Sequence, residues 1–237
     1  MSENESYYCM CLTQGNLPPE AQAVLAQGRA AVMKQAQWQP GDTITIRFLA
    51  GSPELQRRVR ATANEWTKFA NLTFEFRTSA PSDIRIAFIA GNGSWSRLGT
   101  LCKAIAEPEP TMNFGWLTDA SSDAELRRTV LHEFGHAIGL IHEHQNPYRP
   151  IAWNTAAVKA DLSGPPNRWT DRDIEANMFK HYNQDDVRAT NLDPLSIMMY
   201  PVPQSWTLDG FSSEITASCP ITTRDSSGGS IRAEGPR

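Results

Sequence analysis

The sequence predicts an α+β fold in which a twisted sheet and two long helices form an N-terminal lobe. Apolar and polar residues alternate at 44–48, 72–76 and 84–88, which is the period-two pattern of half-buried strands. Apolar residues recur at helical spacing in 53–70 and 123–139, as in helices with one buried face. A chain of 237 residues is long enough to bury these elements in one substantial domain.

The first quarter of the chain carries three element signals. Pro19 to Gln37 is rich in alanine and glutamine, which favour a helix. Trp38 to Asp42 contains a Pro-Gly pair and predicts a turn. Ser52 precedes Pro53, and a capping residue followed by proline at the first helical position predicts that a helix begins here.

Later segments predict an edge strand and an irregular C-terminal lobe. Pro108 and Pro110 precede Thr111 to Leu117, and we expect an edge strand there because prolines are tolerated at sheet edges. Four further prolines between residues 147 and 166 predict irregular structure. Thr170 and Asp173 resemble an N-cap and its partner, which predicts one helix within this lobe.

Composition excludes several classes of protein. The chain has 22 basic and 26 acidic residues without a basic block, so we expect no nucleic-acid partner. No apolar run approaches the roughly 18 residues of a membrane span. The N-terminus has acids and no apolar core where a signal peptide needs basic and apolar residues. We therefore expect an intracellular protein, export by another route, or a missing leader. The oligomeric state stays open.

The strongest chemical signal is a group of histidines in and just after the helix predicted at 123–139. His132 and His136 stand one helical turn apart, so both imidazoles can reach one ion. Glu133 lies about 100° around the helix from His132 and can contact a metal-bound water without ligating the metal. Three neutral histidines would leave zinc its full charge and an open fourth position, which lowers the pKa of a bound water to about 7.

The third histidine, His142, requires a change of chain direction. Six residues of unbroken helix would turn His142 about 120° away from His136. Gly139 lies between them, and glycine tolerates the left-handed conformation that ends a helix. The spacing therefore predicts a helix, a glycine stop and a third ligand on the strand that follows.

Three other interpretations stay open at this stage. A His-Glu-x-x-His segment can be the solvated polar face of an ordinary helix. A metal site can also belong to a catalytically silent zinc-binding module that acts through protein contacts. A zinc hydrolase acting on something other than peptides is the third. Glu133 argues against the silent module, because a structural site needs no base and normally closes its fourth position.

These residues resemble the metzincin clan of zinc peptidases. The segment 132–142 matches the signature of that clan, and Ser196 to Tyr200 contains a methionine turn like the one it requires. The serine, methionine and tyrosine of this turn are similar to the astacin branch, as are Glu143 and His144. Residues 93–99 look like the astacin segment leading into the substrate-binding edge strand.

The resemblance, which spans residues 38–203, implies a zincin-like (metzincin) fold with a twisted mixed sheet, an active-site helix and an irregular C-terminal lobe. It implies an endopeptidase that hydrolyses internal peptide bonds of proteins with one catalytic Zn²⁺ and Glu133 as general base. Met198 would form the hydrophobic floor under the histidines. Tyr200 would ligate zinc and stabilise the tetrahedral intermediate, although the residue alone is also compatible with an ordinary half-buried tyrosine. Gly139 and Glu143 would support the site.

The expected division of the chain follows the same resemblance. Residues 1–37 would be an N-terminal extension with a potential regulatory role. Residues 38–217 would be the metallopeptidase catalytic domain, with its two lobes meeting at about residue 142. Residues 218–237 are rich in Ser, Thr and Gly and are expected to be a disordered tail.

The cysteines depart from the pattern of secreted astacins. The chain has four, at positions 9, 11, 102 and 219, and none is recognisable as a family disulfide. We therefore expect a disulfide-poor microbial relative with reduced thiols, although two disulfides are arithmetically allowed. An alternative interpretation is that Cys9 or Cys11 is a thiolate that blocks zinc, as propeptide cysteines do in some other metzincins.

Overall fold

A computed structural model describes residues 8–12, 36–148, 150–182 and 192–214. The helix expected at 19–37 and the tail expected from residue 218 lie outside the described residues, apart from the last two residues of that helix. These two, Ala36 and Gln37, lie in a turn and in coil. The described residues contain no helix long and apolar enough to cross a membrane.

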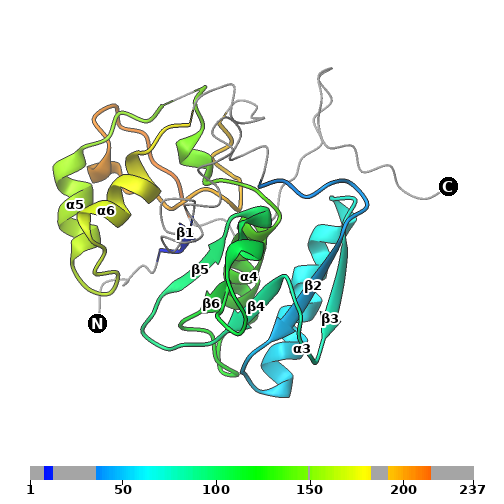
Figure 1. The fold of residues 1–237 in the computed structure, drawn as a ribbon. Helices are drawn as coiled ribbons and strands as arrows, with labels where there is room; N and C mark the ends of the chain where they lie inside the picture. The colour runs from blue at the N-terminus through cyan, green and yellow to red at the C-terminus, as the bar shows by residue number, and fades with distance from the viewer. Residues whose placement is uncertain (1–7, 13–35, 149, 183–191, 215–237) are drawn as a thin grey trace.

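A six-stranded mixed sheet is the centre of the N-terminal lobe (Figure 1). From one edge to the other its strands are β1 (Met10–Leu12), β5 (Ser94–Arg97), β6 (Met112–Phe114), β4 (Ile84–Ala87), β2 (Thr43–Phe48) and β3 (Thr73–Arg77). β5 runs antiparallel to β6, and the other pairs are parallel. The expected α+β fold with a mixed sheet is confirmed.

The strands predicted from alternation are present as β2, β3 and β4, but two expectations about the sheet are wrong. The segment Thr111–Leu117 is no edge strand, because β6 lies between β5 and β4 with all three of its residues buried. Pro108 and Pro110 stand before the strand and do not interrupt its pairing. β4 is buried along its whole length and not on one face only, since it lies inside the sheet between β6 and β2.

Two helices lie side by side against this sheet (Figure 1). α3 (Pro53–Ala63) begins as predicted, with the Ser52 hydroxyl accepting from the Leu55 amide. The helix expected to reach residue 70 changes at Ala63 into a 3₁₀ helix, Asn64–Lys68. There the Trp66 indole donates to the Leu131 carbonyl of the second helix, and this contact ties the two helices together.

The second helix, α4 (Asp123–Ala137), is capped by the Ser122 side chain, which accepts from the Glu125 amide. Every residue from Thr129 to Ala137 is buried. Burial on all sides follows from its position, because the sheet, α3 and the C-terminal lobe surround its last two turns. The end of α4 is therefore held rigidly.

The C-terminal lobe is irregular, as expected, and has its own aromatic core. α6 (Asp171–Ile174) carries the predicted capping box between Thr170 and Asp173 and continues as a π-helical turn, Glu175–Phe179. α5 (Thr155–Ser163) was not predicted. Short 3₁₀ helices at Gly99–Ala104, Glu143–Gln145 and Gln204–Trp206 complete the described elements.

Candidate metal centre and active site

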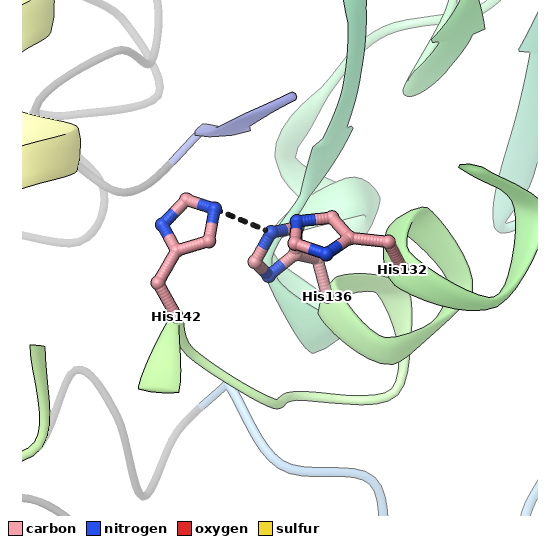
Figure 2. A group of neighbouring side chains, drawn as sticks. All are labelled: His132, His136 and His142. Carbon is pink, nitrogen blue, oxygen red and sulfur yellow. Dashed lines mark hydrogen bonds between the residues drawn. The ribbon is translucent and has the colours of Figure 1, made fainter. Parts of the chain in front are cut away.

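Three histidine rings converge at the end of α4, where the two lobes meet (Figure 2). His132 and His136 project from successive turns of the helix, with ring centroids 4.8 Å apart. The ring of His142 lies 4.5 Å from that of His136 and 5.3 Å from that of His132, centroid to centroid. One ring nitrogen from each residue lies within 4.8 Å of the other two. The predicted group is thus brought together.

Gly139 produces the change of direction that brings His142 back. Its φ is +109°, a left-handed value that residues with a Cβ rarely adopt. Leu140 then donates its amide to the carbonyl of Gly135, which closes the end of the helix. The prediction of a strand for the third histidine is wrong: His142 lies in coil and directly precedes the 3₁₀ helix Glu143–Gln145.

Hydrogen bonds to backbone carbonyls fix the orientation of two of the three rings. Nδ1 of His132 lies 2.8 Å from the Ile197 carbonyl, and Nδ1 of His136 lies 2.8 Å from the Leu140 carbonyl. A carbonyl can only accept, so each Nδ1 carries the proton and each Nε2 carries a lone pair. Nε2 of His132 is buried without a partner among the described residues. Nε2 of His136 lies 3.1 Å from Nε2 of His142 (Figure 2), and three imidazoles that converge in this way fit zinc.

Burial also keeps the rings in the neutral form that binds metal. It lowers the pKa of His132 to about 4, and it lowers the pKa of His136 and His142 well below the usual value. The positive charge that neighbouring histidines would carry lowers the pKa of these two rings further. At neutral pH the three side chains are therefore uncharged ligands.

Glu133 lies in the same buried site, and apart from the thiol of Cys9 its carboxylate oxygens have no partner among the described residues. Burial raises its pKa well above the ordinary range. The thiol of Cys9 and the positive charge of Arg128 lower the pKa, but less than burial raises it. A buried carboxyl with so few partners among the described residues is suited to hold a proton or a polar group that enters the site.

The methionine turn lies directly beneath α4. A Cβ built on Gly135 would stand 2.3 Å from Sδ of Met198, so the missing side chain at 135 makes room for this methionine. Ile197 supplies the carbonyl that orients His132, and the Met198 carbonyl accepts from the amide of Glu143. The turn therefore supports both the helix and the segment that carries the third histidine.

Glu143, which is half-buried, and Tyr200, which is buried, lie beside this turn. The Glu143 carboxylate accepts from the side chain of Asn146 and from the amide of Asp193, and desolvation by partial burial raises its pKa. The ring of Tyr200 packs 4.3 Å from that of His142 and 5.8 Å from that of His132, between centroids. All eight residues singled out from the sequence thus lie in or around one site.

Comparison with known proteins agrees with this arrangement. The sequence model of the astacin peptidase family matches residues 30–203, which is most of the chain and includes the whole site. The chain belongs to the astacin family. The predicted resemblance and the zincin-like fold are confirmed, and a three-histidine zinc site is typical of this family.

Individual relatives place the chain within the family. A structure of bacterial myroilysin is 40% identical and superposes with a TM-score of 0.77, covering 81% of this chain and 94% of that chain. A crystal structure of myroilysin is 37% identical with a TM-score of 0.62, covering 90% and 86%. Blastula protease 10 of Paracentrotus lividus is 29% identical over 126 residues, 51% of this chain. The chain spans about a fifth of that protein, since the match covers 19% of it.

One feature of this astacin-family site was not expected from the residues that form it. β1 adds to the free edge of β5, with Met10 opposite Trp95 and Leu12 opposite Arg97 (Figure 1). The hydroxyl of Tyr200 donates to the carbonyl of Cys9. An N-terminal segment thus passes directly over the metal site.

The C-terminal lobe holds this segment through residues that the sequence did not reveal. Asn177 accepts from the Cys11 amide, and Asn167 accepts from the Tyr8 amide. The side chain of Asn177 also donates to the Asp173 carbonyl, one turn back in the same helix. Neither asparagine belongs to a recognisable sequence motif. In the sequence, only the pair of cysteines at positions 9 and 11 pointed to a contact of this segment with the metal site. In the described residues, Cys9, Cys11 and Cys102 are free and buried.

Proposed function

We propose that this chain is a zinc-dependent endopeptidase that hydrolyses internal peptide bonds of proteins. The observation that carries the proposal is the convergence of three neutral imidazoles with the buried carboxylate of Glu133. His132, His136 and His142 would hold one Zn²⁺. Bound there, zinc supplies a Lewis acid that polarises the scissile carbonyl and lowers the pKa of a water.

Glu133 is the proposed general base. It adjoins His132 in the sequence and lies in the same buried site, where its carboxylate oxygens have no partner among the described residues apart from the thiol of Cys9. Its raised pKa suits a carboxyl that accepts a proton from water and then passes it to the leaving amine. Burial excludes bulk water, so the proton moves between these groups and not to solvent.

Tyr200 is the proposed donor to the oxygen of the scissile carbonyl. Its hydroxyl already donates to a peptide carbonyl, that of Cys9, beside the histidines. Burial raises its pKa well above the usual value, so the phenol stays protonated and can donate at neutral pH. A donor aimed at the carbonyl oxygen stabilises the negative charge that develops during attack. Tyr200→Phe should lower kcat about 10²-fold with the zinc content unchanged.

Met198, Gly139 and Glu143 are the proposed supports of this chemistry. Gly139 permits the turn that returns His142. Glu143 joins the segment after the third histidine to Asp193, close to the methionine turn. Met198 packs against α4 beneath the metal ligands. A ligand set held within about 0.5 Å of its working geometry depends on such neighbours.

The test of the proposed activity is digestion of a mixed peptide library, read by mass spectrometry. New termini inside the peptides should appear with the zinc-loaded protein, disappear with a zinc chelator and return when zinc is added. A chain that binds one zinc and cuts no peptide would be the catalytically silent module. Cleavage of esters without cleavage of peptides would indicate a hydrolase of another class.

We also propose that the N-terminal extension, residues 1–37, keeps the enzyme latent. Two observations support this. β1 occupies the edge of β5, where an extended substrate would pair. Cys9 interacts with Glu133 through its thiol and with Tyr200 through its carbonyl. A segment held in this way excludes both a substrate and its water.

Latency is tested on the full chain by following the library digestion over time. Cys9→Ser should begin cutting earlier and faster than the parent, because a hydroxyl is a weaker metal ligand than a thiolate. Cys102→Ser is the matched control, since it changes a buried thiol in the core of the N-terminal lobe. Identical time courses for the parent and Cys9→Ser would refute the role of Cys9.

A further inference from the structure

Tyr8 is the residue of the N-terminal segment that is buried in the C-terminal lobe. Its side chain is only 7% exposed. Its ring stacks on Trp206 at 5.3 Å and meets Tyr200 edge-on at 5.3 Å, centroid to centroid. Trp169 closes a third side at 6.4 Å. The hydroxyl donates to the Pro201 carbonyl over 3.1 Å. We call the three rings and this carbonyl the Tyr8 site.

The two tryptophans of the Tyr8 site are held by hydrogen bonds within the C-terminal lobe. The Trp206 indole donates to Asp161 over 2.6 Å, and the Trp169 amide donates to the Leu162 carbonyl. Both contacts lie within the C-terminal lobe. The two tryptophans are therefore held independently of the segment, and they leave a place shaped for one aromatic ring.

The Tyr8 site is also adjacent to the reacting atoms. Cys9, the next residue along the chain, places its carbonyl on the Tyr200 hydroxyl and its thiol beside Glu133. A substrate residue that binds in the Tyr8 site is thus next to the residue whose carbonyl is attacked. The direction of the bound segment decides whether this substrate residue comes before or after the bond that is cut. β1 runs parallel to β5, and a segment bound in the productive direction would present its own peptide bond to Glu133.

From these observations we propose that the Tyr8 site is a substrate subsite for an aromatic side chain, immediately C-terminal to the bond that is cut. The proposal rests on the proposed endopeptidase function and names its substrate class. In this proposal the substrate runs antiparallel to β5, opposite to β1, so that its residue after the scissile bond takes the place of Tyr8. Tyrosine fits completely, because its hydroxyl can donate to the Pro201 carbonyl as Tyr8 does.

Charge around the Tyr8 site favours a neutral ring over an acid. Burial raises the pKa of Tyr8, and the nearby carboxylate of Asp161 raises it further. An aspartate or glutamate side chain would meet this like charge in a site walled by aromatic rings, where a buried charge is costly. We therefore expect acidic residues to be disfavoured at this position.

The experiment uses the full chain, as the parent and as Cys9→Ser, with the mixed peptide library. The readout is the residue on each side of every cut. Tyr, Phe and Trp should be enriched roughly 10-fold or more at the position after the cut. Cuts without this enrichment, or with the enrichment before the cut, would overturn the inference and leave the endopeptidase function standing. No cuts by either protein would overturn both.

Two variants tie the preference to the Tyr8 site. Trp206→Phe and Trp169→Leu should each lower the ratio of cuts before aromatic residues to all other cuts, a ratio that is independent of total activity. Trp153→Leu is the matched control, because this tryptophan belongs to the same lobe and its ring contacts His144 and Phe179. An unchanged ratio in both test variants, with both still folded by circular dichroism, would overturn the assignment.

Discussion

Gly135 and Met198 are packed so closely that no side chain fits between the helix and the methionine turn. A Cβ at position 135 would lie 2.3 Å from the Met198 sulfur and 3.3 Å from the ring of Trp66. The glycine costs up to about 1 kcal/mol of helix propensity relative to alanine. Its place one residue before a metal ligand shows that the approach of the turn to the helix outweighs this cost.

Gly135→Ala should therefore destabilise the protein in spite of its better helix propensity. Overpacking of this kind costs about 1–3 kcal/mol, and displacement of Met198 should also weaken zinc retention. Urea denaturation and zinc release to a chelator measure the two effects. Gly164→Ala is the control, because its Cβ would meet only ordinary contacts at 3.6 Å or more. Equal stability of the two variants would contradict the packing argument.

Arg85 should be among the residues most important for stability, although it is charged and lies in a central strand. It is 2% exposed, and its guanidinium donates to the carbonyls of Ser82, Ile105 and Glu109. Arg85→Met keeps the volume but leaves these carbonyls without that donor, so the free energy of unfolding should fall by about 2–5 kcal/mol.

The control for this prediction is an exposed arginine of the same sheet. Arg77 pairs with Glu75 on the surface of β3, where such pairs contribute little. Arg77→Met should change the stability by less than about 0.5 kcal/mol in the same urea titration. If Arg77→Met lowered the free energy of unfolding more than Arg85→Met, the stabilising role given to Arg85 would be refuted.

The metal-free protein should lose stability as the pH falls from about 6.5 to 4. Burial lowers the pKa of His132 and His144 to about 4, and that of His136 and His142 well below the usual value. Between these pH values the unfolded chain binds protons that the folded chain does not, so protonation favours unfolding. For His132 the shift corresponds to roughly 3 kcal/mol across this window.

Two carboxyl groups act in the opposite direction. The raised pKa values of Glu133 and Glu143 mean that the folded state binds protons first there, which favours folding as the pH falls. Four histidines outweigh two carboxyl groups, so the urea midpoint of the zinc-stripped protein should be lower at pH 5 than at pH 7. A midpoint that rises on acidification would contradict the buried neutral histidines.

Local patterns predicted the parts of the fold that depend on neighbouring residues. The alternation at Ile44 and Ile46 and the cap at Ser52 act within a few residues, and each element is present. The metal centre was predictable for the same reason. Its ligands and Gly139 lie within eleven residues, and helical geometry fixes their relative positions.

The order of the strands and the packing of the N-terminal segment could not be predicted in this way. β6 looked like an edge strand, but pairing with strands far along the chain places it inside the sheet. Tyr200 and Cys9 are 191 residues apart in the sequence, and no periodicity reports such a contact. α5 was not predicted because its short sequence is bounded by proline-rich segments and has only two buried residues.

The measurement that tests the central claim most directly compares the parent with Glu133→Gln for zinc content and peptide cleavage. Glutamine has nearly the same shape but cannot accept the proton of a water. The parent and the variant should each retain one zinc per chain, while the rate of cleavage falls by a factor of about 10²–10⁴. Undiminished cleavage by Glu133→Gln would contradict the role of Glu133 as the base, and loss of zinc from this variant would make Glu133 a structural residue of the metal site.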